Sequence, residues 1–155
     1  MNLWINIAKK ALIETIKKVD VLVVNDSEAK QLSETDNIFS AAKALQAMGP
    51  RIVIIKKGEH GAILFMEDDI FCVPAYPLES IVDPTGAGDT FVGGFTGYLH
   101  KTKDLSFNNL KRAVVYGTVM ASFSVQNFST VGIENLEQSE ITKRYNEFIK
   151  MTQFD

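Results

Sequence analysis

The stretch DPTGAGDTF, residues 83–91, places three small residues where an extended segment turns into a predicted helix. Small side chains let backbone N–H groups approach an anion closely, and the N-terminus of a helix favours negative charge. The stretch therefore predicts a phosphate or oxyanion cradle at Gly86, Ala87 and Gly88. Asp89 follows in the first helical turn, where a carboxylate can take a proton from a hydroxyl nucleophile.

Two familiar phosphate-binding motifs are excluded here, and one structural alternative stays open. A P-loop closes its turn with Gly-Lys-Ser/Thr, and no lysine follows Gly88. The dinucleotide-binding fingerprint needs a further spaced glycine that this turn lacks. The open alternative is that Asp89 serves only as an N-terminal cap of its helix, because the helix dipole stabilises a carboxylate there.

Hydrophobic periodicity outward from this stretch predicts helices and strands in alternating order. An amphipathic helix is expected over residues 3–19, packed by Trp4, and strands buried on both faces at 21–24 and 51–56. A hairpin is expected at 62–65 and 70–73, with Cys72 as a small core residue. Further helices are expected at 27–33, 38–48, 88–100, 107–126 and 141–149. This order predicts an α/β fold with a mainly parallel sheet.

Glycines also occur inside the helix that follows the cradle, at Gly93, Gly94 and Gly97. Each glycine in a helix interior costs about 1 kcal/mol relative to alanine, so three of them imply close approach to a ligand or to another helix. Helix packing is the simpler interpretation for Gly97.

Composition limits the class of protein. The 155 residues predict one domain, and 46% hydrophobic with 23% charged residues is ordinary for a globular chain. A net charge of −3 argues against a nucleic-acid partner, and no apolar run approaches the length of a membrane span. One cysteine excludes a disulfide framework, and without a signal-peptide core the expected location is cytoplasmic.

The run DPTGAGDTFVGGFT, residues 83–96, resembles the C-terminal signature of the ribokinase-like (PfkB) carbohydrate and nucleoside kinases. NDSE at 25–28 resembles that family's Asn-x-x-Glu motif, and KKGEHG at 56–61 resembles its glycine-containing nucleotide loop. The three stretches occur in the family's order. The resemblance implies a ribokinase-like (Rossmann-like) three-layer α/β/α fold and ATP-dependent phosphorylation of a hydroxymethyl group on a small sugar or nucleoside.

The resemblance also implies catalytic and metal-binding roles for individual residues. Asp89 would be the base that activates the acceptor hydroxyl, and the N–H groups of Gly86, Ala87 and Gly88 would hold the phosphates. Asn25 and Glu28 would bind Mg²⁺ through water, although the same pair is also typical of a helix cap.

Further residues would contact the nucleotide or a second cation. By the same resemblance, those along ATP and its adenine would be Lys56, Gly58, Gly61, Tyr116 and Gly117. Asp83 and the Thr85 carbonyl match a monovalent-cation (K⁺) site of some members, whereas residues 127–132 do not clearly match the rest of that site.

Members of this family are about twice as long as this chain. The resemblance thus implies that residues 1–155 are the C-terminal nucleotide-binding and catalytic part of a kinase, truncated on the N-terminal side and inactive as an isolated fragment. The alternative is a non-catalytic α/β remnant that binds a nucleotide or a protein partner. A sheet edge left unpaired beside residues 21–24 or 52–55 predicts a homo-oligomer.

Overall fold

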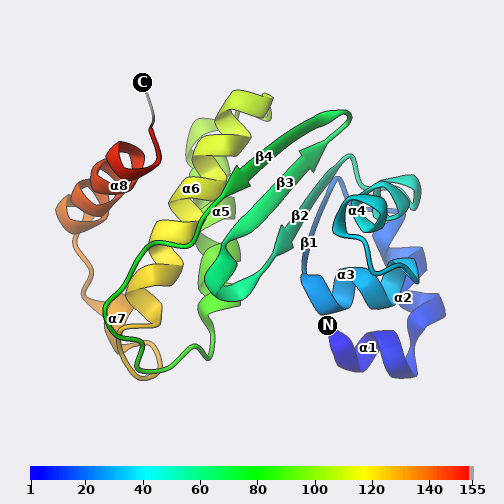
Figure 1. Cartoon of the computed structure of the whole chain (residues 1–155), viewed down its shortest axis with the longest axis horizontal. Helices are drawn as coiled ribbons and strands as arrows, with labels where there is room; N and C mark the ends of the chain where they lie inside the picture. Colours follow the sequence, from blue (N-terminus) through cyan, green and yellow to red (C-terminus); the bar gives the residue numbers. More distant parts are fainter. Residues whose placement is uncertain (154–155) are drawn as a thin grey trace. The chain divides into compact units, whose positions relative to one another are not determined.

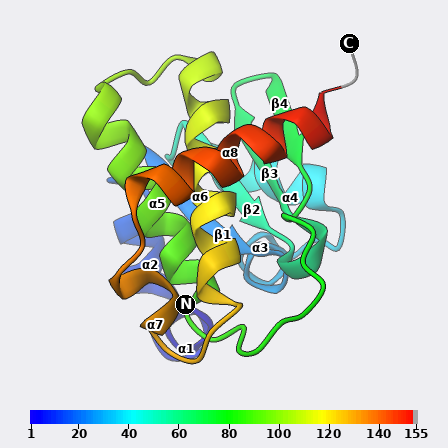
Figure 2. The same ribbon diagram turned by 90° about the vertical axis from the view of Figure 1, so that its left-hand side faces the viewer.

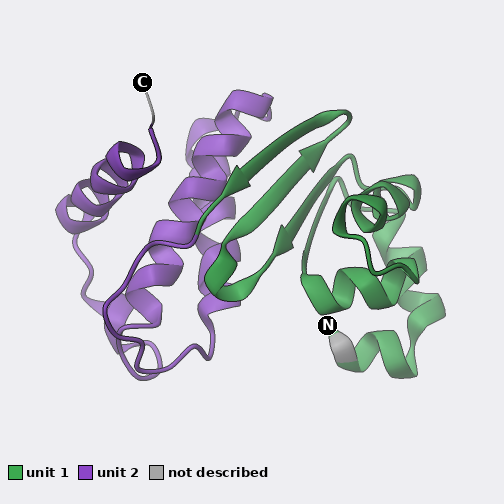
Figure 3. Ribbon diagram, in the orientation of Figure 1, with its two compact units in different colours: residues 1–74 green, residues 75–155 purple. Residues whose placement is uncertain are grey.

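The structure, a computed structural model, describes residues 1–153, apart from the side chain of Asn2. The chain divides into two compact units, unit 1 (Met1–Pro74) and unit 2 (Ala75–Asp155), coloured separately in Figure 3. The residues that the sequence singles out are shared between the units: 25–61 belong to unit 1 and 83–117 to unit 2.

Unit 1 is built on a four-stranded sheet in the order β1-β2-β3-β4, seen in Figure 1. The strands are β1 (Val21–Asn25), β2 (Ile52–Lys56), β3 (Ala62–Met66) and β4 (Asp69–Val73). β1 and β2 are parallel, because helices carry the chain from one to the other. β2 with β3 and β3 with β4 are antiparallel, because their short connections allow no crossover. The α/β class is confirmed, but the expectation of a mainly parallel sheet is wrong for these strands.

Four α-helices complete unit 1: α1 (Asn2–Ile7), α2 (Lys9–Ile16), α3 (Asp26–Ser33) and α4 (Ile38–Ala47). The single helix expected over residues 3–19 is two helices, because Ala8 leaves the helical conformation with φ −143°. In α1, before this break, Ile5 lies in the core and the Asn6 side chain accepts a hydrogen bond from Gln31 of α3. Trp4 is 57% exposed, so the expectation that it packs the first helix is wrong.

The core of unit 1 lies between these helices and one face of the sheet. Leu22 and Val24 of β1 belong to it, together with Val53 and Ile55 of β2. β1 alternates between buried and half-buried residues, so the prediction that it is buried on both faces is wrong. β2 is buried over Ile52–Ile55, as predicted. Cys72 is exposed rather than in the core, because β4 is the opposite edge strand.

β1 also decides where the predicted self-association can occur. β2 is an interior strand of the described sheet, so of the two edges proposed from sequence only β1 remains. Its five residues include no charge and no proline, which are the usual protection of an edge strand. We expect light scattering to detect dimers or larger species and Val23→Lys to shift them toward monomer. A monomeric wild-type chain at high concentration would contradict this prediction.

Unit 2 consists of an extended segment followed by helices, drawn from green to red in Figure 2. The helices are α5 (Ala87–Thr102), α6 (Phe107–Ser124), α7 (Val131–Glu134) and α8 (Gln138–Thr152). α8 is fastened to α6 by Arg144, whose guanidinium lies 3.6 Å from the centre of the Phe123 ring and donates to Ser122 Oγ at 3.0 Å. No helix within residues 1–153 is both long enough and apolar enough to cross a bilayer.

Glycines set the contact between α5 and α6. A Cβ added to Gly94 would lie 3.1 Å from Gly117 Cα, and one added to Gly117 would lie 2.7 Å from the Phe91 carbonyl oxygen. Both helices therefore need glycine at this crossing. The expectation that Gly97 packs against a helix is wrong, because a Cβ there would meet nothing within 4 Å.

Candidate functional site

The segment 83–89 enters α5 through a glycine in the left-handed conformation. Gly86 is the N-cap of α5 and has φ 80°, which costs glycine little and an L side chain much more. A Cβ added there would meet nothing within 4 Å, so the space beside this turn is open. Gly86 is thus required by the backbone conformation and not by contact with a neighbour.

The first turn of α5 presents backbone N–H groups, since helix geometry leaves the first four without an intrahelical acceptor. Gly86 provides no side-chain cap for them. The Ala87 N–H donates to the Pro84 carbonyl at 3.2 Å, so it shapes the turn and is not directed to a ligand. Gly86 and Gly88 N–H find no acceptor in the described part of the chain. Two of the three predicted cradle amides therefore remain available to an anion.

Asp89 stands at the third helical position, where an acidic side chain often reaches back to the N-cap. Glu28 of α3 and Glu140 of α8 occupy the same position and close capping boxes by accepting from the N-cap N–H, at 3.0 Å and 3.1 Å. The exposed Asp89 carboxylate makes no such bond and no ion pair within the described residues. This observation disfavours the cap alternative and leaves the carboxylate accessible.

Asn25 and Glu28 form a capping box at the start of α3. Asn25 Oδ1 accepts from the Glu28 N–H at 2.8 Å, and Glu28 Oε2 accepts from the Asn25 N–H at 3.0 Å. The helix-cap interpretation of this motif is therefore confirmed. Glu28 Oε1 lies outside the box and pairs with the N-terminal ammonium at 2.9 Å.

The electrostatic surroundings keep Glu28 ionised although the residue is buried. Burial raises the pKa of its carboxyl, but the Asn25 N–H, the N-terminal ammonium and the Lys56 charge together lower it below the ordinary 4.5. Lys56 ends β2 and is paired in register with Asn25 at the end of β1. The parallel pairing of β1 with β2 thus brings Asn25, Glu28 and Lys56 to the carboxyl ends of these two strands.

The loop after Lys56 is a tight turn that needs two glycines. Gly58 and Gly61 have φ of 57° and 86°, and the Lys57 N–H donates to the Gly61 carbonyl at 2.7 Å. A Cβ on Gly58 would meet nothing within 4 Å, so this turn also borders open space. His60 is exposed in this turn.

Tyr116 and Gly117 lie on α6. The Tyr116 ring belongs to an aromatic cluster. Its centre lies 5.3 Å from the ring centre of Tyr98 of α5 and 6.2 Å from that of Tyr145 of α8. Gly117 has the packing role described above, against Phe91. An additional contact of either residue with adenine stays a prediction.

Asp83 is the centre of a hydrogen-bonded junction that sequence reasoning missed. Its Oδ1 accepts from the Thr85 N–H at 2.9 Å. The Thr85 hydroxyl and N–H, followed by the Ser129 N–H, lower the pKa of Asp83. The Val125 carbonyl accepts from the N–H groups of Val82 and Asp83, at 2.8 Å and 3.3 Å. Because Val125 contributes a backbone atom only, no residue pattern could reveal this contact.

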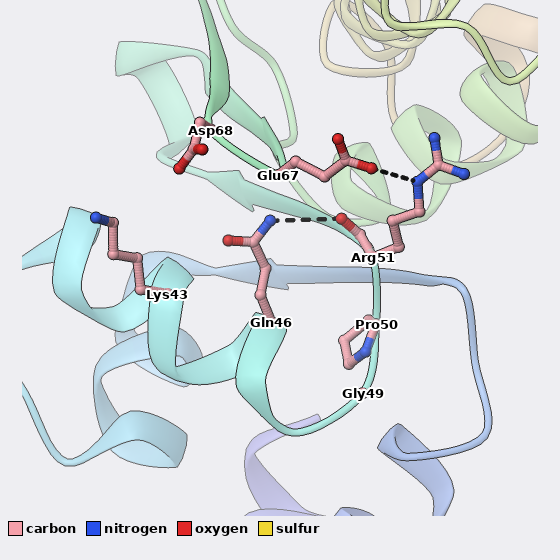
Figure 4. A pocket seen from close by; sticks show the side chains of 7 residues that line it. All are labelled: Lys43, Gln46, Gly49, Pro50, Arg51, Glu67 and Asp68. Atoms are coloured by element: carbon pink, nitrogen blue, oxygen red, sulfur yellow. Dashed lines mark hydrogen bonds and ion pairs between the residues drawn. The ribbon is translucent and has the colours of Figure 1, made fainter.

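A separate open hollow in unit 1 contains none of the predicted site residues. Arg51 Nε pairs with Glu67 Oε1 at 3.3 Å, and Gln46 donates to the Arg51 carbonyl at 3.4 Å. Figure 4 marks both interactions with dashed lines. Lys43, Gly49, Pro50 and Asp68 complete its lining. Arg51 immediately precedes β2, so the hollow lies at the opposite end of that strand from Lys56. Within residues 1–153 no group of three or more His, Cys, Asp or Glu is arranged to hold a metal ion.

Comparison with known families decides the ancestry of these motifs. A sequence model described as "pfkB family carbohydrate kinase" matches residues 2–136. The chain belongs to the pfkB family. The match covers both capping-box residues, the Lys56–Gly61 turn and the whole segment 83–89, so the sequence-based resemblance is confirmed.

Relatives of this pfkB family chain act on sugars and nucleosides. It is 37% identical over 90 residues to a cytidine kinase of Thermococcus kodakarensis, covering 56% of this chain and 32% of that protein. It is 31% identical over 124 residues to a ribokinase of Staphylococcus aureus, covering 77% of this chain and 39% of that protein. The chain therefore spans less than half the length of these curated relatives.

A solved structure confirms the fold. Aminoimidazole riboside kinase from Salmonella enterica, complexed with aminoimidazole riboside and an ATP analogue, superposes with a TM-score of 0.76 at 25% identity. The superposition covers 86% of this chain and 44% of that one. The described residues thus have the α/β fold of the ribokinase-like kinases, over about half of that fold's full chain.

Proposed function

We propose that residues 1–155 form the nucleotide-binding and catalytic part of a cytoplasmic kinase that transfers a phosphoryl group from ATP to a hydroxyl of a small sugar or nucleoside. The observation that carries this proposal is the exposed Asp89 carboxylate, which bonds to no other described residue and lies in the first turn of α5, where the Gly86 and Gly88 N–H groups have no acceptor among the described residues. Membership of the pfkB family and the named relatives support the reaction class and the two classes of substrate.

Asp89 is the proposed base. Its carboxylate accepts the proton of the acceptor hydroxyl while that oxygen attacks the γ-phosphorus of ATP. The amides of the first turn of α5, together with the positive end of the helix, stabilise the negative charge that the phosphoryl group carries in the transition state. The Lys56–Gly61 turn is proposed to lie along the nucleotide, because its glycines border open space and Lys56 supplies positive charge.

Mg²⁺ belongs to this proposal, and the Glu28 carboxylate fits it, because carboxylate oxygens are ligands that Mg²⁺ prefers and the ion commonly binds through retained water. Asn25 Oδ1 already accepts from the Glu28 N–H and from the Ser27 hydroxyl, both at 2.8 Å, so Asn25 would act by holding Glu28 in place. Glu28 is ionised, and its Oε1 lies outside the capping box. When bound, Mg²⁺ would neutralise charge on the β- and γ-phosphates.

A second candidate function is a non-catalytic module that binds a nucleotide or a protein partner. One observation favours it: the relatives with named activities are more than twice as long as the part of them that this chain matches. The two candidates differ in phosphoryl transfer and share nucleotide binding, so a binding experiment tests their common basis.

We expect the 155-residue chain to bind Mg·ATP weakly, because the space beside Gly86 is open in the described part of the chain and water has access to it. Titration calorimetry measures this binding directly. Asn25→Ala should remove the Mg²⁺-dependent part of the affinity and lower the free energy of unfolding by about 1 kcal/mol.

Asn37→Ala is the matched control, because Asn37 caps α4 by accepting from the Ser40 N–H at 2.9 Å. We expect it to lower stability by a similar amount without changing the affinity for Mg·ATP. Absence of binding heat at several millimolar nucleotide would count against the proposed function.

A further inference from the structure

We propose that Arg144 of α8 is a positioning residue that fastens the extended segment leading into the anion cradle to the last turn of α6. This segment, residues 75–86, contains neither helix nor strand. The fastening stands on contacts within unit 2, whereas its consequence for nucleotide binding rests on the proposed function.

The first observation is that the segment depends on α6 for its position. Pro77 and Pro84 have no N–H to donate, which disfavours regular structure along it. The N–H groups of Val82 and Asp83 donate to the Val125 carbonyl, the C-cap of α6, at 2.8 Å and 3.3 Å. Figures 1 and 2 show the segment running alongside α6. The entrance to the cradle is therefore held by the C-terminal end of that helix.

The second observation is that one side chain joins this helix end to the start of the segment. The Arg144 guanidinium carbon lies 3.6 Å from the centre of the Phe123 ring on α6 and 5.1 Å from the centre of the Tyr76 ring. Its Nη1 donates to Ser122 Oγ at 3.0 Å. A planar guanidinium can stack on rings and still donate from its edge, a combination that a lysine ammonium lacks.

The third observation is that α8 receives Tyr76 with more than one residue. Glu147 Oε2 accepts from the Tyr76 hydroxyl at 3.3 Å, and the Phe148 ring centre lies 5.6 Å from that of Tyr76. Residues three and four positions apart share one face of a helix, so Arg144, Glu147 and Phe148 act together on Tyr76. This face of α8 thus holds the segment at Tyr76 while Arg144 holds α8 to α6.

The side-chain contact at Tyr76 supports the backbone contact at Val82. Phe123 and Val125 belong to the same end of α6, and Val82 follows Tyr76 by six positions. Fixing Tyr76 shortens the loop that the Val82 bond must close, which lowers its cost in chain entropy. The turn at Gly86 follows directly, so loss of the Arg144 contact should loosen the entrance to the cradle.

The test follows the amide protons of Val82 and Asp83 by NMR hydrogen exchange on the full 155-residue chain. Arg144→Met keeps an apolar stem and removes the guanidinium, and Tyr76→Leu removes the ring. Tyr76→Phe keeps the ring and removes only the hydroxyl, so it is the conservative variant that should preserve the contact.

Two control variants separate this contact from charge and from general stability. Lys143→Met removes a cation from the exposed neighbour of Arg144 on α8. Ser106→Ala removes the N-cap of α6, whose hydroxyl oxygen accepts from the Asn109 N–H at 3.4 Å, and so weakens unit 2 at the opposite end of that helix.

We expect exchange of the Val82 and Asp83 amides to accelerate about three- to fivefold in Arg144→Met and Tyr76→Leu, the factor that a partly buried cation–π contact supplies. Exchange should be unchanged in Tyr76→Phe and in both controls. Mg·ATP at about five times its Kd should slow exchange of both amides about sixfold in the wild-type chain, because a ligand that binds only the fastened state stabilises it by the factor 1 + [L]/Kd.

Unchanged exchange in Arg144→Met, or equal acceleration in Ser106→Ala, would overturn the inference. So would Mg·ATP that binds without slowing these amides, because the fastened segment would then play no part in the site. If no Mg·ATP bound, the proposed function would fail while the variants still decided whether Arg144 fastens the segment. If Arg144→Met did not fold, comparing Tyr76→Leu with Tyr76→Phe would test the same contact from its other side.

Discussion

Asp89→Asn should lower the rate of phosphoryl transfer by about 10²–10⁴-fold while the protein folds normally, because the change removes a proton acceptor but keeps the size of the side chain. The measurement requires an active assembly, in which this chain is joined to the N-terminal half of a pfkB kinase and assayed with sugars and nucleosides. The isolated 155-residue chain is expected to show no measurable transfer.

The stability of the same variant separates catalysis from capping. Asp89 forms no capping bond, and Asn is as good as Asp at helix N-termini, so the free energy of unfolding should change by less than about 1 kcal/mol. Asp104→Asn, an exposed aspartate at the entrance to α6, should leave the rate unchanged. If Asp89→Asn kept most of the activity of the assembly, Asp89 would not be the base.

A second large effect is expected at the crossing of α5 and α6. Gly117→Ala should lower the free energy of unfolding by about 2–3 kcal/mol, because overpacking a tight interface forces the backbone to move. The new Cβ would lie 2.7 Å from the Phe91 carbonyl oxygen, a backbone atom that has no rotamer to change. Urea denaturation of the two proteins measures the difference.

Gly97→Ala is the control for this substitution, because it makes the same chemical change in a helix at a position that faces open space. It should raise stability by roughly 0.5–1 kcal/mol, the difference in helix propensity between alanine and glycine. Equal effects of the two substitutions would mean that α5 and α6 do not meet at Gly117 in solution.

Local sequence features anticipated most secondary structure correctly. Continuous apolar runs predicted β2 and the β3–β4 hairpin, and apolar periodicity predicted α4, α6 and α8 to within a few residues. Helix α5 begins one residue before its predicted start, at Ala87. These features depend on the chain's own period and capping residues, so neighbouring sequence was sufficient to locate them.

Errors arose where burial depends on a partner that is remote in sequence. The same apolar composition marked β1 and β2 as buried strands, yet β1 is an edge strand and alternates in exposure. Trp4 and Cys72 are apolar or small, and both are exposed because of where their elements lie in unit 1. Gly94 and Gly97 lie in the same helix and look alike in the sequence. Only the crossing with α6 shows that a Cβ would clash at Gly94 and meet open space at Gly97.

The sequence by itself determined which residues carry the proposed chemistry, namely the glycine turn before α5 and the aspartate in its first turn, and it placed the chain in the pfkB family. Those features are local, because a left-handed glycine and a helix N-terminus are formed by consecutive residues. Only the tertiary structure decided that Asp89 is free of a capping bond, whereas Glu28 at the equivalent position is not. It also decided that the Val125 carbonyl accepts from the N–H groups of Val82 and Asp83, because backbone groups bond to whatever partner folding places beside them, whatever their own side chains are.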